Sequence, residues 1–222
     1  TARISGDGSR VIFAANASNL VSGDSNAEND IFLAASNNGV PITRVNIGPG
    51  NTQASAPAGT GLIGALNADG SLLAFSSSAV SLPDWGEFAD ETLYLRIPSL
   101  DQTIALSIPE GNLPREGFNY EPDFDYSGRW VTFASSDRLY VGAEAGGVYV
   151  IDVVEGLITQ VSTGGNSGNV HQPRLSADGT GIVWHSYSTT QVPGDTNGTW
   201  DVFYAANPLW VETPIFVDGF DG

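Results

Sequence analysis

The segment Ile4-Ser5-Gly6-Asp7-Gly8-Ser9-Arg10-Val11-Ile12-Phe13 reveals the architecture of the chain, because related forms of it occur four times in the 222 residues. In each copy a short polar turn ends in a glycine, and an aromatic residue follows five positions later. The four glycine–aromatic pairs are Gly8 and Phe13, Gly70 and Phe75, Gly128 and Phe133, and Gly179 and Trp184. Successive glycines are 62, 58 and 51 residues apart. Repetition at such a period indicates an array of equivalent structural units.

Each unit contains the signals of four short strands. Asp-Gly between two apolar segments is a hairpin signal, because glycine accepts the positive φ that such turns require. After the turn Val11 and Phe13 alternate with other residues and share one face of a strand. Shorter and more polar segments, such as 41–47 and 157–163, fit a fourth strand at an outer edge. A third strand is marked by a second apolar–aromatic pair: Ile31-Phe32, Leu93-Tyr94, Val148-Tyr149 and Val202-Phe203.

The repeats predict an all-β fold, a β-propeller built of four four-stranded antiparallel blades. No window shows a sustained apolar period of 3.6 residues, which argues against helices. A repeat of four strands and about 50–60 residues favours a propeller over a sandwich or a barrel. Four blades form either a closed four-bladed ring or part of a larger ring. The predicted blades span 1–47, 61–108, 120–163 and 170–213, and 214–222 form a C-terminal tail.

The repeat resembles that of TolB-type (WD40-like) β-propellers. Residues 5–13 and 176–184 match its S-x-D-G-x-x-V-x-F pattern best, and the segment from His171 to Ser176 is similar to the lead-in to its turn. Asn67 and the stretch Asp125-Tyr126-Ser127 depart from the pattern. The resemblance implies a binding platform, and it leaves the partner open because these propellers bind diverse partners.

Charge restricts the possible partners. The chain has 25 acidic and 8 basic residues, and its net charge is −17. Such a field repels phosphate backbones and anionic lipid, so we expect neither a nucleic-acid partner nor a membrane surface. No stretch approaches the ~18 consecutive apolar residues of a membrane span. Basic or neutral protein surfaces, glycans and cations remain open.

Composition indicates a location outside the cytoplasm. Cysteine, methionine and lysine are all absent, and we expect a processed chain whose leader has been removed. A lysine-free surface rich in Asp, Gly, Ser and Asn suits a secreted bacterial protein. The last nine residues resemble the I-F-x-D-G-F tail that ends many secreted proteobacterial proteins. We therefore predict a secreted, periplasmic or cell-surface protein.

Two loops predict a calcium site. Antiparallel order places the tight turns on one side of the propeller and the long loops on the other, where binding usually occurs. In the first and fourth repeats, Asp, Asn and Asp recur 11, 13 and 17 residues after the first aromatic residue. Calcium prefers six to eight oxygen ligands, so carboxylates and amides suit it, although these loops lack a closing glutamate. Alternatively, the same residues form Asx-turns that shape the loop. The candidate ligands are Asp24, Asn26, Asp30, Asp195, Asn197 and Asp201.

Four further residues are candidates for binding a partner. Trp85, Phe88 and Trp200 lie in predicted loops, where aromatic rings stack on sugars or anchor a protein. His171 precedes an innermost strand and is expected to approach the central channel. Alternatively, the aromatic rings fold back over their own blades. His185 alternates with Trp184 and is expected to pack within the sheet.

These features support three functional hypotheses. The first is a non-catalytic protein-interaction or assembly module that uses its acidic loop face and can self-associate to complete a ring. The second is a calcium-dependent carbohydrate-binding propeller. The third is a hydrolase, which is disfavoured because neither histidine has an evident Ser or Asp companion. The sequence therefore predicts that the chain is not an enzyme.

Overall fold

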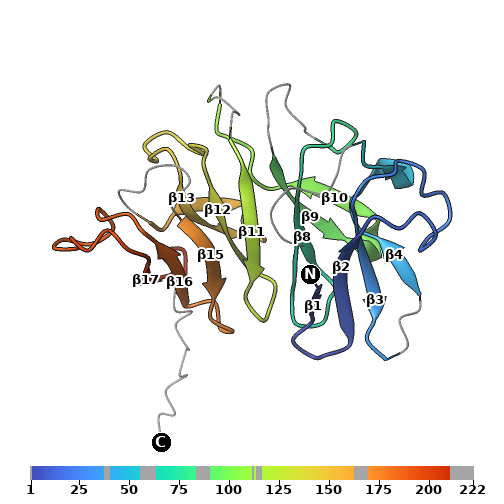
Figure 1. Cartoon of the computed structure of the whole chain (residues 1–222), viewed down its shortest axis with the longest axis horizontal. Coiled ribbons are helices and arrows are strands. Elements are labelled where there is room, and N and C mark those ends of the chain that lie inside the picture. The colour runs from blue at the N-terminus through green and yellow to red at the C-terminus, as the bar shows by residue number, and fades with distance from the viewer. Residues whose placement is uncertain are drawn as a thin grey trace, which may run out of the picture.

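Turn glycines and cross-strand aromatic pairs build antiparallel sheets that lie next to one another in an arc (Figure 1). The computed structural model describes residues 2–37, 41–55, 64–83, 91–111, 113, 117–162 and 170–210. Blade 1 contains β1 (Ala2–Ile4), β2 (Arg10–Ala15), β3 (Asp30–Ala35) and β4 (Ile42–Arg44). Blade 2 contains β7 (Ala65–Leu66), β8 (Leu73–Ser77), β9 (Thr92–Ile97) and β10 (Gln102–Ala105). Blade 3 contains β11 (Asn119–Phe124), β12 (Trp130–Ser135), β13 (Gly147–Asp152) and β14 (Leu157–Gln160). Blade 4 contains β15 (Val170–Leu175), β16 (Gly181–Ser186) and β17 (Asp201–Ala206).

The all-β propeller prediction is confirmed, with differences at the outer strands. Blade 4 has three strands in the described part of the chain, because 207–210 form no strand and the rest of its predicted fourth strand lies beyond them. The outer strands β4 and β14 are shorter than predicted. A small hairpin that the sequence did not predict, β5 (Ile47–Gly48) and β6 (Thr52–Gln53), flanks the 3-10 turn η1 (Pro49–Asn51) between blades 1 and 2. A second such turn, η2 (Pro98–Leu100), joins β9 to β10.

The hairpin turns keep one hydrogen bond even where their sequences diverge. In blade 1 the Ser5 hydroxyl accepts from the N–H of Arg10 at 2.9 Å. The carboxylate of Asp125 does the same for Trp130 in blade 3, also at 2.9 Å. The remaining acceptors are Asn67 in blade 2 and Ser176 in blade 4. The departures from the repeat pattern are therefore exchanges of one oxygen acceptor for another.

The two aromatic residues of each repeat are cross-strand partners. Phe13 lies opposite Phe32 in the register of β2 and β3, and their ring centroids are 5.6 Å apart. Trp184 and Phe203 stack at 5.9 Å in blade 4. The equivalent pairs are Phe75 with Tyr94 and Phe133 with Tyr149. Because the register fixes these pairs, loops of different length account for the unequal spacing of the aromatic residues in the sequence.

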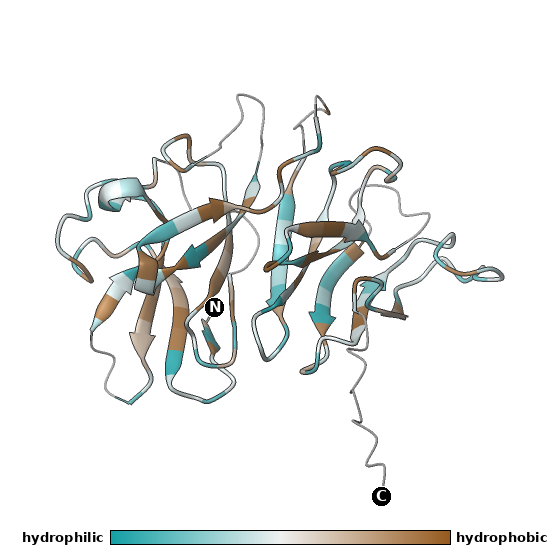
Figure 2. Cartoon of the chain, turned by 180° about the vertical axis from the view of Figure 1, so that it is seen from behind, coloured by the Kyte–Doolittle hydropathy of each residue, from teal (hydrophilic) through white to brown (hydrophobic). Residues whose placement is uncertain are grey.

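In the described residues the hydrophobic core consists of three clusters, one at each junction between neighbouring blades. At the junction of blades 3 and 4, Val148 and Val150 lie in one cluster with Ile182 and Trp184. Apolar and hydrophilic residues alternate along the strands (Figure 2), as expected when the faces of a sheet pack against neighbouring blades. Each sheet is therefore stabilised mainly by the blades beside it.

The four blades do not close into a ring. Blades 1 and 4 lie at opposite ends of the arc (Figure 1), and no strand pairing joins them in the described residues. The sequence left open a closed four-bladed ring or part of a larger ring, and the structure is a partial ring. No helix in the described ranges is both long enough and apolar enough to cross a membrane.

Candidate functional site

Long loops and short turns lie at opposite edges of the arc. The loops that join β2 to β3 and β12 to β13 are at the upper edge in Figure 1, and the turns of β1–β2 and β11–β12 are at the lower edge. We call the upper edge, together with the β16–β17 loop at the far left of Figure 1, the loop edge. It contains most of the candidate residues from the sequence. Trp85, Phe88 and the tail 214–222 lie outside the described residues.

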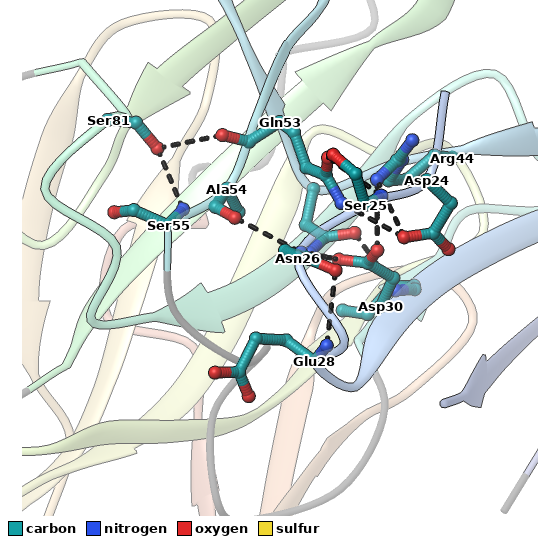
Figure 3. A network of polar contacts seen from close by, with 12 residues as sticks. Asp24, Ser25, Asn26, Glu28, Asp30, Arg44, Gln53, Ala54, Ser55 and Ser81 are labelled. Carbon is teal, nitrogen blue, oxygen red and sulfur yellow. Dashed lines mark hydrogen bonds and ion pairs between the residues drawn. The ribbon is translucent and has the colours of Figure 1, made fainter. Parts of the chain in front are cut away.

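In blade 1 the Asp-Asn-Asp loop is organised around Asp30, whose side chain is fully buried. The Arg44 guanidinium donates to Asp30 Oδ2 at 3.0 Å. Asp30 Oδ1 accepts from Asn46 Nδ2 at 2.7 Å and from Asn26 Nδ2 at 3.3 Å (Figure 3). Asn46 also accepts the N–H of Ile31 at 2.9 Å. The carboxylate of Asp30 is thus neutralised and hydrogen-bonded by groups of its own chain.

The first aspartate of this loop shares the same arginine. Asp24 Oδ1 lies 3.5 Å from Arg44 Nη1 and accepts from Gln53 Nε2 at 3.0 Å (Figure 3). A guanidinium therefore lies between the two carboxylates that would ligate calcium. Calcium binding by Asp24, Asn26 and Asp30 stays a prediction.

The two matching loops share an Asx-turn. Asn26 Oδ1 accepts the N–H of Glu28 at 3.1 Å, and Asn197 Oδ1 accepts that of Thr199 at 2.9 Å. Asn197 Nδ2 also donates to Asp201 at 2.9 Å, as Asn26 does to Asp30. In both blades the side chains of this motif therefore form hydrogen bonds that shape the loop, as the alternative interpretation expects.

The blade 4 loop borders a hollow of about 470 Å³, which Asp195, Asn197 and Asp201 line together with Tyr204. Across the described ranges, no group of three or more His, Asp or Glu side chains is placed to hold a metal ion. Calcium binding by Asp195, Asn197 and Asp201 likewise stays a prediction.

Two predicted binding residues meet in an aromatic–histidine cluster at the loop edge of blade 4. The Trp200 ring lies 5.5 Å from that of His171 and 4.9 Å from that of His185, between centroids. Tyr187 approaches Trp200 edge-on at 4.8 Å. Trp200 is 52% exposed, so one part of its indole packs on these rings and the rest faces solvent. We define the aromatic–histidine cluster as His171, His185, Tyr187 and Trp200.

The cluster continues into the inner strand of blade 3. Tyr120 lies 5.9 Å from His171 between ring centroids. Glu121 Oε2 lies 3.6 Å from His171 Nδ1 and accepts the N–H of Gln172 at 2.6 Å. Burial raises the pKa of the Tyr120 hydroxyl to about 12, and the nearby charge of Glu121 adds to this. Tyr120 is therefore neutral throughout the physiological range.

Charged groups below this cluster join three blades. Arg3 Nη1 lies 3.4 Å from Asp123 Oδ1 and donates to the carbonyl of Pro122 at 3.1 Å. Asp123 also accepts the N–H of Leu175 at 3.1 Å. Burial raises the pKa of Asp123, while the nearby charge of Arg174 opposes that shift. These contacts link the innermost strands of blades 1, 3 and 4, which is a structural role.

Sequence reasoning identified His171 and Trp200 but missed three of their neighbours. His185 lies half-buried within β16, opposite Val202, and also contacts Trp200. Tyr187 directly follows β16, and Tyr120 belongs to another blade. His171 and His185 lie together because they are register partners of β15 and β16. The register of these strands shifts between His171 and Arg174, and strand alternation in the sequence does not predict such a shift.

Comparison with known proteins supports the fold. No protein-family model and no curated protein sequence matches the chain. Among solved structures, a TolB candidate from Agrobacterium tumefaciens is similar with a TM-score of 0.57 and 16% identity, over 92% of this chain and 57% of that one. TolB from Acinetobacter baumannii is similar with a TM-score of 0.55 and 15% identity, over 91% of this chain and 39% of that one. The chain thus spans well under two thirds of either protein.

A third similarity corrects one prediction. A puromycin-hydrolyzing peptidase from Mycobacterium tuberculosis matches with a TM-score of 0.53 and 15% identity, over 93% of this chain and 29% of that one. The same fold therefore occurs within an enzyme. The prediction that the chain is not an enzyme is wrong, because a propeller of this fold is compatible with an enzyme and gives no ground for excluding catalysis.

The repeated turns, the stacked aromatic pairs and the two TolB structures agree on one architecture. The chain has the fold of a TolB-like β-propeller.

Proposed function

We propose that the chain is a protein-interaction module that binds a partner protein at the aromatic–histidine cluster. The observation that supports this most is the half-exposed Trp200, held by the rings of His171, His185 and Tyr187. Tryptophan and tyrosine dominate the binding energy of protein interfaces because they bury a large area at little cost in conformational entropy. A tryptophan that packs against three rings loses less side-chain freedom when a partner binds.

The net charge of the chain favours partners with a basic or neutral surface. With a net charge of −17, the acidic loop face attracts a basic partner surface and repels an acidic one. Asp195 and Asp201 line the hollow of the blade 4 loop, and Asp201 directly follows Trp200 in the sequence, so both supply negative charge to the loop that carries the indole. We therefore expect a partner that presents an apolar group within a basic or neutral surface.

We propose a secreted, periplasmic or cell-surface location. The sequence lacks cysteine and lysine, which suits a bacterial protein outside the cytoplasm, and its tail resembles that of secreted proteins. In that location the partner is an envelope or extracellular protein.

A carbohydrate ligand, bound with calcium, is the second candidate. The observation in its favour is the hollow of about 470 Å³, which places the oxygen-bearing side chains of Asp195 and Asn197 beside an aromatic-rich surface. Aromatic faces stack on sugar rings, and carboxylate and amide oxygens suit calcium.

A capture experiment tests the proposed function. The chain is immobilised and exposed to envelope and secreted proteins of its source, and captured proteins are identified and titrated. We expect Trp200→Ala to weaken binding at least about tenfold, as for an interface hot spot. Val154→Ala truncates an exposed apolar side chain of blade 3 and is expected to leave binding unchanged. Equal binding by wild type and Trp200→Ala would contradict the proposal, and calcium-dependent glycan binding without any captured protein would favour the second candidate.

A further inference from the structure

One face of blade 4 presents apolar side chains to solvent. Val183 on β16 and Tyr204 on β17 are register partners, and Val202 lies on the same face of β17, two residues before Tyr204. Val202 is 79% exposed and Tyr204 68%. In the described part of the chain no further blade covers these side chains. We define Val183, Val202 and Tyr204 as the blade 4 docking face.

The equivalent positions in the other blades are interface positions. Val150 is the repeat equivalent of Tyr204, and Val148 is that of Val202. Both valines are fully buried and belong to one core cluster with Trp184 of blade 4. The equivalents in blades 1 and 2 are also buried: Ile31, Leu33, Leu93 and Leu95. The blade 4 docking face thus occupies the place of a blade–blade interface.

The opposite end of the arc has the complementary half of that interface. Ile4, Val11 and Phe13 of blade 1 are the repeat equivalents of residues that in every other blade face the preceding blade. Ile4 is 61% exposed, and Val11 and Phe13 are only partly buried. Their buried equivalents include Leu73, Phe75, Phe124, Val131, Phe133, Ile182 and Trp184. We define Ile4, Val11 and Phe13 as the blade 1 docking face.

A series of backbone hydrogen bonds shows how one blade follows the next. The N–H of Asp7 in blade 1 donates to the carbonyl of Ala68 in blade 2 at 2.8 Å. Ala68 donates to Tyr126 of blade 3 at 3.3 Å, and Tyr126 to Ala177 of blade 4 at 2.9 Å. Ala177 is exposed at the end of this series. A further blade would continue the series in the same direction.

We propose that two copies of the chain associate head to tail, the blade 4 docking face of each packing on the blade 1 docking face of the other. A second copy fits because one chain holds both complementary halves of a junction that it already forms three times internally. Head-to-tail contacts of this kind close into a ring when the rotation allows it. Two copies supply eight blades, which lies within the four to eight blades of typical propellers.

This pairing goes beyond the proposed function, since its contacts are Val183, Val202 and Tyr204 rather than Trp200. The two surfaces adjoin on one face of blade 4, because His185 of the aromatic–histidine cluster is the register partner of Val202. The net charge of −17 on each copy opposes association, and salt screens that repulsion. The dimer is therefore expected to strengthen as the salt concentration rises.

Sedimentation equilibrium of the purified chain tests the pairing. We expect a species of twice the 23.2 kDa mass at micromolar concentration and high salt. Val202→Glu is expected to raise the dissociation constant at least tenfold, because it places a charge in an apolar interface. Val154→Glu changes an equally exposed valine at the β13–β14 turn of blade 3 and is expected to leave the dimer intact. Both substitutions are at exposed sites, and thermal melts verify that the variants fold.

A mixing experiment distinguishes head-to-tail pairing from a symmetric contact. Ile4→Glu and Tyr204→Glu each damage both junctions of a homodimer, so each variant alone should be monomeric. An equimolar mixture retains one junction with two unaltered faces, so we expect dimers to reappear in it.

Three results would overturn the pairing. The first is a wild-type chain that stays monomeric at low and high salt. The second is a dimer that neither Val202→Glu nor Ile4→Glu weakens. The third is an open oligomer of more than two copies. Loss of the dimer with unchanged capture by the Trp200 surface would refute the pairing alone. Failure of capture by the monomeric Ile4→Glu variant, whose aromatic–histidine cluster is unaltered, would refute the proposed function alone.

Discussion

Arg44 of β4 donates to the fully buried carboxylate of Asp30 at the start of β3, with 3.0 Å between Nη1 and Oδ2. Because the Arg44 side chain is itself almost completely buried, neither charge has much access to water. A buried pair of this kind fixes the geometry of its surroundings, and removing one partner leaves an uncompensated charge.

Arg44→Leu should therefore strongly destabilise blade 1. We expect a loss of about 3–5 kcal/mol in the free energy of unfolding, because Asp30 stays buried without its cation. Urea denaturation followed by tryptophan fluorescence measures this. The matched control is Arg129→Leu, since Arg129 also pairs with an aspartate, Asp152 at 2.7 Å, but its side chain is 47% exposed. The control should lose less than Arg44→Leu, because the half-exposed Arg129 charge is screened by water and Asp152 keeps the N–H groups of Val154 and Glu155 as donors. Equal losses would contradict the structural role of Arg44.

Trp184→Ala should destabilise the junction of blades 3 and 4. The indole stacks on Phe203 and belongs to the core cluster that contains Val148 and Val150. Truncation of a buried tryptophan costs about 3–5 kcal/mol through lost burial and the remaining cavity. Urea denaturation midpoints at low protein concentration measure the loss. Tyr204→Ala, at an exposed site of the next strand, should cost less than about 1 kcal/mol there, and a similar loss in both variants would argue against this junction.

Gly179→Ala should cost more than Gly8→Ala, although both glycines have nearly the same backbone conformation. Their φ angles are +74° and +73°, and the left-handed region costs an alanine about 1–2 kcal/mol at either position. A Cβ at Gly179 would also collide with the Trp130 ring of blade 3, whereas one at Gly8 meets no atom within 4 Å. Thermal melts of the two variants give the difference. Equal melting temperatures would show that Gly179 does not lie against blade 3.

Acid should remove the stability contributed by the blade 4 turn. Hydrogen bonds from Ser176 and Thr180 lower the pKa of Asp178 to about 2 from an ordinary value of 3.8. A depressed folded-state pKa means that this stability is present above pH 3.8 and is lost as the pH falls toward 2. Asp178→Asn should therefore be less stable than wild type near neutral pH and should lose less stability between pH 4 and 2. Melts over that range test this, and parallel curves for the two proteins would contradict it.

The fold could be predicted from the sequence because its determinants are local. The Gly8 turn and the Phe13 strand lie within ten residues, and a hairpin register then places Phe13 opposite Phe32. Sequence divergence at Asn67 and Asp125 did not alter the turn, since an oxygen acceptor occurs at both positions.

The candidate site could be predicted only in part, because its contacts are long-range. Trp200 and His171 are 29 positions apart, and nothing in their local patterns shows that they meet. The Asp-Asn-Asp motif suggested calcium, but the role of Arg44 depends on a strand pairing that brings it to Asp30, 14 residues away. The exposed faces of blades 1 and 4 could not be predicted, because the equivalent positions of the other blades have similar apolar residues and are buried.

The accessibility of Trp200 in the complex with a captured partner tests the account most directly. Hydroxyl-radical footprinting measures the oxidation of each tryptophan with and without that partner. We expect oxidation of Trp200 to fall markedly on binding, while that of the buried Trp184 stays low in both samples. Unchanged oxidation of Trp200 in a saturated complex would contradict the assignment of the aromatic–histidine cluster as the binding surface.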